Sequence, residues 1–256
     1  MFDDMQYWSL IKKLTLREIK ARYKQSFLGF FWIILNPFFQ MLIMSFVFSK
    51  IMLISNLGVP YPLFIYAGLL PWTFLVASLT SSMNVFINDA SLIKKIYFPR
   101  EILVISTILA KLFDFLLSLL IFVAMMVFYK VNFSWFMLLF IPIFLIQLIF
   151  VYSLSLVLAA FNLYYRDIQY LFNLVINLWF YLTPIVYSVD FFPEKYRIIF
   201  QLNPMSVFIN GYRKVLFGGD WPNFHSLTVG LLISSIMLFI SRIIFSKLEK
   251  NFADIA

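Results

Sequence analysis

Long apolar runs dominate this chain and tie it to a membrane. Six stretches are apolar over about the 20 residues that a helix needs to cross roughly 30 Å of hydrocarbon. With 63% hydrophobic and 12% charged residues, a soluble fold would have to expose large apolar patches. The sequence therefore predicts an all-α polytopic membrane protein with a single membrane domain over residues 1–256. The predicted spans are 29–54, 63–87, 102–129, 135–161, 170–187 and 227–245.

A basic segment leads into the first predicted span without a linker. Positive charge beside a span is retained on the cytoplasmic side, so the N-terminus is expected to lie there. We predict that the segment 1–28 is amphipathic, with its first part on the cytoplasmic membrane surface and its second part leading into the bilayer. Thr15 and Glu18 have the spacing of a capping box, which predicts a break near Thr15. The basic residues of this segment are Lys12, Lys13, Arg17, Lys20, Arg22 and Lys24.

Charge counting supports an even number of spans with both termini in the cytoplasm. Of the 20 Lys and Arg residues, 13 fall in segments predicted to be inside and 6 in segments predicted to be outside. The remaining one, Lys111, lies within the third predicted span. We therefore attribute the formal charge of +8 to basic residues that set the membrane topology beside anionic lipid, and not to a nucleic-acid partner.

The connection over 188–226 is too long for a turn and too apolar for a hydrated loop. Pro193 and Asn203-Pro204 are helix-start signals, and Gly218 is a helix-end signal, which together predict two short helices. Neither is long enough to cross a bilayer. We expect re-entrant or interfacial helices at the outer leaflet that shape an exit; the alternative is a lid that only packs on the outer rim.

The sequence offers little for catalysis. It has no cysteine, one histidine, seven glycines and no G-x-x-x-x-G-K-[ST] phosphate loop, which argues against a nucleotide site and a metal centre in this chain. Paired carboxylates for glycosyl transfer and a Ser/His/Asp set are not apparent. Lys111 and Asp114 are spaced three apart within a span and predict an intramembrane ion pair; a proton relay is the alternative. We expect no catalytic residue, no metal and no cofactor in this chain.

The pattern R-[DE]-I occurs three times at predicted cytoplasmic helix starts. The copies begin with Arg17-Glu18, Arg100-Glu101 and Arg166-Asp167. Acidic residues suit helix N-termini and arginines suit the inner interface, which is a sufficient local explanation. The alternative is that these segments form one docking surface for a cytoplasmic partner.

Five motifs are spread in order over almost the whole chain. They are L-x-x-R-E-I-K-x-R-Y-K-Q-S-x-L-G-x-x-W over 14–32, F-P-R-E-I over 98–102, N-x-x-x-R-D-I over 162–168, T-P-I-V-Y over 183–187 and N-P-M-x(6)-Y-R over 203–213. Together they resemble the permease subunits of ABC transporters that export polysaccharides, most closely the Wzm-like permeases for lipid-linked O-antigen. Capsule and teichoic-acid exporters are near relatives.

The resemblance implies a homodimer in the bacterial inner membrane, docked on two copies of a separate ABC ATPase that binds ATP and Mg²⁺. It implies export of a lipid-linked polysaccharide, with an exit bounded by 188–226. An ABC permease for a smaller lipid or drug, and less so a membrane glycan enzyme, are the alternatives. The implied gate helix contains Arg17, Glu18, Lys20, Arg22 and Tyr23. The implied coupling contacts, centred on the loop 88–101, are Leu92, Ile93, Lys94, Lys95, Ile96, Tyr97, Arg100, Glu101, Arg166 and Asp167.

Aromatic residues make up 21% of the chain, more than the interfacial belts need. Flat aromatic faces can stack on the C–H faces of sugar rings, and a sliding polymer needs weak, repeated sites that it can leave. The alternative for each residue is a side chain that faces lipid or a neighbouring helix. The candidates for a channel lining are Phe31, Trp32, Phe38, Phe39, Trp179, Tyr181 and Tyr187.

Overall fold

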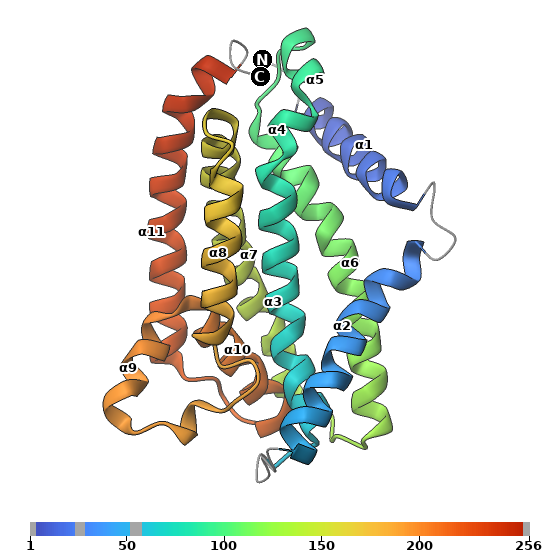
Figure 1. Ribbon diagram of the computed structural model, residues 1–256, viewed down its shortest axis with the longest axis vertical. Coiled ribbons are helices and arrows are strands. Elements are labelled where there is room, and N and C mark those ends of the chain that lie inside the picture. Colours follow the sequence, from blue (N-terminus) through green and yellow to red (C-terminus); the bar gives the residue numbers. More distant parts are fainter. Residues whose placement is uncertain (1–3, 24–28, 52–57, 253–256) are drawn as a thin grey trace.

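The computed structural model describes residues 4–23, 29–51 and 58–252, and the regular structure in these ranges is entirely helical. Within these ranges, four helices are long and apolar enough to cross a membrane, and they run side by side along the molecule (Figure 1). This confirms the all-α membrane fold. The four are α3 (Tyr61–Met83), α6 (Glu101–Phe128), α7 (Phe140–Tyr164), which follows the 3₁₀ turn η2 (Trp135–Leu139), and α11 (Phe224–Leu248).

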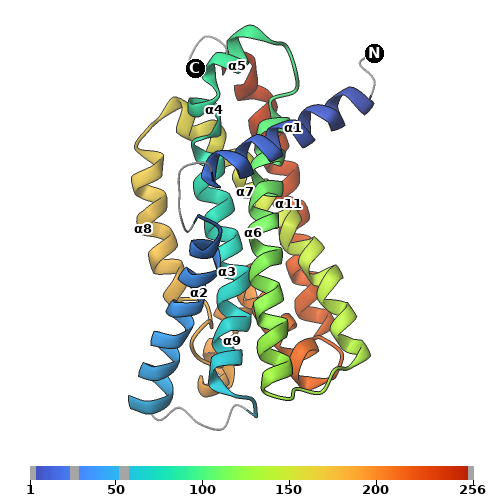
Figure 2. The same cartoon turned by 90° about the vertical axis from the view of Figure 1, so that its right-hand side faces the viewer.

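Helix α3 forms the centre of the bundle. Its side chains are buried on nearly every face, which is expected of a helix that is apolar all round. It packs against α6, α7 and α2 (Gly29–Ser45), and Figure 2 shows α2 and α6 along its length. The helix α2 contains Pro37 and continues as a π-helix, η1 (Phe46–Ile51).

Two sets of short helices close the ends of the bundle. Helices α4 (Val85–Asn88) and α5 (Ala90–Lys95) lie at one end with the last turns of α11 (Figure 1). Helices α9 (Glu194–Leu202) and α10 (Pro204–Arg213) lie at the other, followed by the π-helix η4 (Lys214–Gly218). We call these the α5 end and the α9 end. The remaining short elements are η3 (Val189–Phe191) and η5 (Glu249–Asn251).

The predicted break near Thr15 is wrong, because α1 (Asp4–Tyr23) is one continuous helix. The capping-box groups are used elsewhere. The Thr15 hydroxyl donates to the Ser106 carbonyl at 3.3 Å, and the Glu18 carboxylate hydrogen-bonds to Thr107, both on α6. The two residues therefore attach α1 to α6, across which it lies in Figure 2, instead of starting a second helix. Residues 24–28 of the predicted amphipathic segment are outside the described residues.

The fifth predicted span is also corrected. Helix α8 (Ile168–Tyr181) ends before Thr183-Pro184, which the sequence analysis placed inside a span. Proline disfavours helical backbone in the residue before it and lacks an N–H donor. The 14 residues of α8 give a helix of about 21 Å, shorter than the hydrocarbon core.

The helix signals at the α9 end are partly confirmed. Asn203 caps α10 as predicted, since its side-chain oxygen accepts from the Met205 N–H at 3.1 Å. Pro193 is the residue before α9 and not its first helical residue. Gly218, the predicted helix-end signal, is the last residue of the helical segment over 204–218. The residue that terminates this segment is Gly219, which adopts the left-handed conformation that favours glycine (φ +58°).

A buried amide joins three helices in the core. Gln147 on α7 donates to the Pro71 carbonyl of α3 at 2.9 Å and accepts from the Tyr212 hydroxyl of α10 at 2.7 Å. Gln147 and Tyr212 are both fully buried. Each side chain therefore supplies a partner that the other could not find in lipid.

We expect Gln147→Leu to lower the melting temperature of the purified protein in detergent, because the buried Tyr212 hydroxyl loses its acceptor, at a cost of about 1–3 kcal/mol. The Gln147→Leu/Tyr212→Phe double variant should recover part of this loss, since neither side chain of that pair is then left unpaired. A double variant that loses as much stability as Gln147→Leu alone, or more, would contradict the pairing.

Candidate functional site

The α5 end presents an apolar and basic surface held by two buried anchors. Ile93 and Phe98 are each 3% exposed and fix the segment to the bundle. Between them the exposed side chains are those of Lys94, Lys95, Ile96 and Tyr97, with Tyr97 80% exposed. Large aromatic side chains are enriched at protein interfaces, so the exposed Tyr97 makes this segment a candidate docking surface.

An ion pair ties α1 to the start of α5. One Nη of Arg17 reaches both carboxylate oxygens of Asp89, at 2.8 and 2.6 Å. Asp89 is the cap residue of α5, but its side chain makes no capping hydrogen bond. The sequence analysis named Arg17 and missed Asp89, because a carboxylate in a loop gives no local sign of a partner 72 residues away.

A second charged cluster fastens α1 to the middle of α6. Arg22 forms an ion pair with Asp114 and donates to the Ala110 carbonyl at 3.3 Å. The sequence analysis predicted an ion pair between Asp114 and Lys111. In the structure Asp114 forms an ion pair with Arg22, and Lys111 lies close enough to Asp114 and Glu18 to be attracted by both carboxylates. Burial raises the pKa of Glu18, an effect opposed by its hydrogen bond to Thr107 and by the nearby cations.

The other R-[DE]-I copies differ from the first. The Glu101 carboxylate accepts from the Tyr152 hydroxyl at 2.7 Å and lies 3.7 Å from Arg242, so it joins α6 to α7 and α11. Arg100 donates its main-chain N–H to Glu249 at 3.1 Å. Arg166 and Asp167 are exposed just before α8. The three copies thus share an end of the molecule but not a common set of contacts.

The candidate aromatic residues divide into two groups. Trp32, Phe39 and Tyr181 are 57%, 51% and 73% exposed on α2 and α8, which lie on either side of α3 in Figure 1. Phe38 is half-buried and meets the Phe39 ring edge-on. A cavity of about 280 Å³ between these helices is lined by Gln40, Met44, Trp72, Val76, Ile176, Asn177, Phe180 and Tyr181.

Two candidates are engaged within the chain. Trp179 donates to the Asn203 side chain at 3.0 Å and packs edge-on against Trp72. The Tyr187 hydroxyl donates to the Tyr181 carbonyl at 2.8 Å. The side chains of Phe31 and Tyr23 lie outside the described part of the structure.

A buried arginine holds the α9 end together, a residue that the sequence analysis included only as the last position of a motif. All five N–H groups of Arg213 donate to main-chain carbonyls, and its guanidinium lies 3.5 Å from the Phe64 ring centre. The acceptors are the carbonyls of Phe64, Pro184, Ile185 and Tyr187. Arg213 therefore joins the first turn of α3 to the segment after α8.

The side chains that the structure describes contain no cluster of His, Cys, Asp and Glu that could hold a metal ion. Membrane-length helices packed in one bundle define the class as a polytopic membrane protein. The chain belongs to the ABC-2 type transporter family, whose family model matches residues 9–217. Members of this family are transport components of ABC transporters.

Relatives with curated names match nearly their whole length. The chain is 33% identical to the O-antigen export system permease protein RfbA of Klebsiella pneumoniae, over 97% of this chain and 95% of that protein. It is 31% identical to the protein of the same name in Myxococcus xanthus, over 97% and 96%. It is 24% identical to the polysialic acid transport protein KpsM of Escherichia coli, over 94% and 93%.

Proposed function

We propose that this chain is the transmembrane subunit of an ABC exporter that moves a lipid-linked polysaccharide of the O-antigen type from the cytoplasm across the bacterial inner membrane. The observation that carries the proposal is the match to O-antigen export permeases over 95% or more of both chains. A capsule exporter is the second candidate, supported by the weaker match to KpsM.

Six membrane crossings follow if α2 with η1 and α8 join the four long helices. The continuous helical run Gly29–Ile51 is long enough to cross, and α8 crosses with the help of the segment that Arg213 clamps. Basic residues at the α5 end, including Lys94, Lys95 and Lys247, support a cytoplasmic location of that end. Helices α9 and α10 then enter the outer leaflet without crossing it.

A separate ABC ATPase, in two copies on a homodimer of this chain, would bind ATP and Mg²⁺ and supply the energy. The α5 end is the docking surface in this arrangement, with Tyr97 and the lysines beside it as its exposed contacts. The faces of α2 and α8 that expose Trp32, Phe39 and Tyr181 would meet across the dimer and line the conduit. Stacking on such faces holds a sugar chain weakly enough to let it slide.

The Arg17–Asp89 ion pair gives this docking surface a direct connection to α1. Movement of α5 on its ATPase would pull on Arg17 and so on the gate helix, which Arg22 anchors to α6. The Arg17 side chain is 53% exposed and the Asp89 side chain is 14% exposed, and solvent screening of the arginine keeps the contribution of such a pair to folding small. Its removal should therefore affect export more than stability.

Charge reversal tests the connection. Arg17→Glu and Asp89→Arg should each reduce surface polysaccharide severalfold, since like charges then face each other, and the double swap should restore most of it. Immunoblotting of surface glycan, beside the amount of membrane-embedded protein, measures this. Lys12→Glu, an exposed basic residue on the same helix, is the matched control. A double swap no better than the single variants would contradict the connection.

Partner capture tests the docking surface. A pull-down of this chain from native membranes in mild detergent should bring a P-loop ATPase in equal amount. Lys94→Glu with Tyr97→Ala should reduce the captured ATPase at least several-fold, because both side chains are exposed at the α5 end. Lys195→Glu at the α9 end should leave capture unchanged. Capture that is lost equally in both variants, or absent from the wild type, would overturn the assignment.

Loss of the gene distinguishes the substrates. A deletion strain should lose O-antigen from its surface and accumulate lipid-linked glycan inside, and the intact gene should restore export. Loss of capsule with O-antigen retained would favour the KpsM-like function. Unchanged surface glycan would favour a smaller lipid or drug as substrate.

A further inference from the structure

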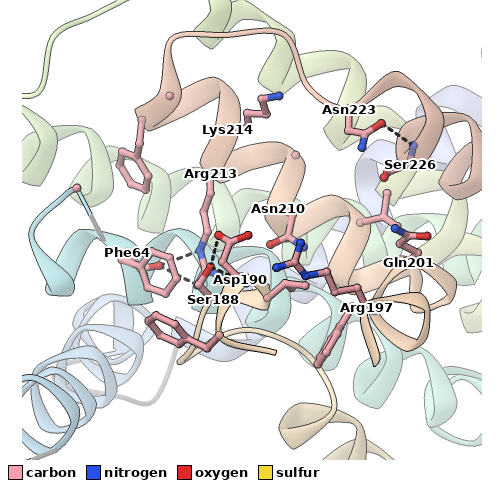
Figure 3. A pocket seen from close by; sticks show the side chains of 18 of the residues that line it. Phe64, Ser188, Asp190, Arg197, Gln201, Asn210, Arg213, Lys214, Asn223 and Ser226 are labelled. Carbon is pink, nitrogen blue, oxygen red and sulfur yellow. Dashed lines mark hydrogen bonds between the residues drawn. The ribbon is translucent and has the colours of Figure 1, made fainter. Parts of the chain in front are cut away.

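A cavity of about 730 Å³ lies at the α9 end, away from the docking surface and from the α2–α8 faces. Its walls come from the start of α3, the 188–191 segment, α9, α10 and the start of α11 (Figure 3). Its volume is within the range of about 300–1,000 Å³ of small-molecule sites. The cavity is therefore large enough for a ligand and not only for water.

The cavity is electropositive. Three cations and one carboxylate line it: Arg197, Arg213, Lys214 and Asp190. The Asp190 carboxylate accepts from the Ser188 hydroxyl at 2.9 Å, and Lys214 lies 3.6 Å from Asp220. Arg213 is saturated by neutral carbonyls, which satisfy its hydrogen bonds but leave its charge uncompensated. A fixed buried charge beside a cavity attracts anions into it.

The donors that remain available belong to neighbouring walls. Arg197 uses only its Nε, which donates to the Phe192 carbonyl at 3.3 Å, so within the described chain both of its Nη groups have no partner. The amides of Gln201 and Asn210 likewise have no hydrogen bond in that part of the chain. Figure 3 shows Arg197 and Asn210 directed into the cavity from α9 and α10. A guanidinium fork matches the geometry of phosphate oxygens.

We propose that this cavity binds the phosphate group of a phosphorylated polyol, with Arg197 as its direct ligand and Asn210 as a second donor. The polyol is the headgroup of a membrane phospholipid or a sugar phosphate of the transported glycan. Phe191, Phe200 and Phe217 line other parts of the cavity and suit the C–H faces of the polyol.

Ligand-observed NMR on the purified protein tests the site, in a polyoxyethylene detergent that carries neither phosphate nor sugar. The probes are glycerol 3-phosphate, glucose 1-phosphate and glucose. We expect at least one phosphate to bind and glucose to bind about tenfold or more weakly, because charge-assisted hydrogen bonds carry the affinity. Tighter glycerol 3-phosphate indicates a lipid headgroup, and tighter glucose 1-phosphate indicates the glycan.

Variants separate the cavity from general surface charge. Arg197→Gln should weaken phosphate binding about tenfold, and Asn210→Ala should weaken it severalfold. Lys195→Gln removes the same charge from α9 outside the cavity and should leave binding unchanged. If Arg197→Gln unfolds under the conditions of the assay, the Asn210→Ala variant tests the proposal. The Asn210 side chain is exposed, so its removal should not disturb the fold.

Three results would overturn the proposal. The first is wild-type protein that binds neither phosphate, and the second is glucose that binds as tightly as the phosphates. The third is an equal loss of binding in Arg197→Gln and Lys195→Gln. None of them bears on whether the chain exports a polysaccharide, because the binding assay uses the isolated protein.

Discussion

Hydrocarbon offers no water to a backbone, and this constraint governs the whole arrangement. Helices satisfy their own N–H and C=O groups, so the chain crosses as helices. Where a helix ends inside the bundle, a side chain can hydrogen-bond to the main-chain groups that the helix leaves without a partner. Asn162 donates to the Met83 carbonyl where α3 ends, and Arg213 supplies five donors where the chain after α8 is not helical. Asn162 and Arg213 are thus buried polar residues that serve interruptions of helices.

The long helices could be predicted from the sequence because their signal is local. The third span was predicted over 102–129 and is Glu101–Phe128, and the sixth was predicted over 227–245 and lies within Phe224–Leu248. The fifth span ended early because of a proline in its own sequence, whereas the capping-box prediction failed because it depended on partners far along the chain. The capping box at Thr15 is unused because Ser106 and Thr107 take its groups.

The candidate site was predictable to a smaller degree for the same reason. Motifs pointed to Arg17 and to the exposed lysines before Tyr97, and the structure gathers these at one end. Their role in docking stays a prediction. Asp89 was missed, since only the folded chain brings it to Arg17. Trp179 and Tyr187 are residue types that suit stacking on sugars, but the side chain of each donates a hydrogen bond within the chain.

The joint formed by Arg213 also restricts which sequences can share this fold. A Cβ at Gly68 would lie 2.9 Å from one Nη of Arg213 and 3.3 Å from the main chain of Ile185. The glycine and the arginine are therefore one structural unit, although 145 positions separate them in the sequence (213 minus 68). Among related chains, a residue larger than glycine at position 68 should accompany a residue smaller than arginine at position 213. A chimera that takes these two positions from different parents should assemble poorly.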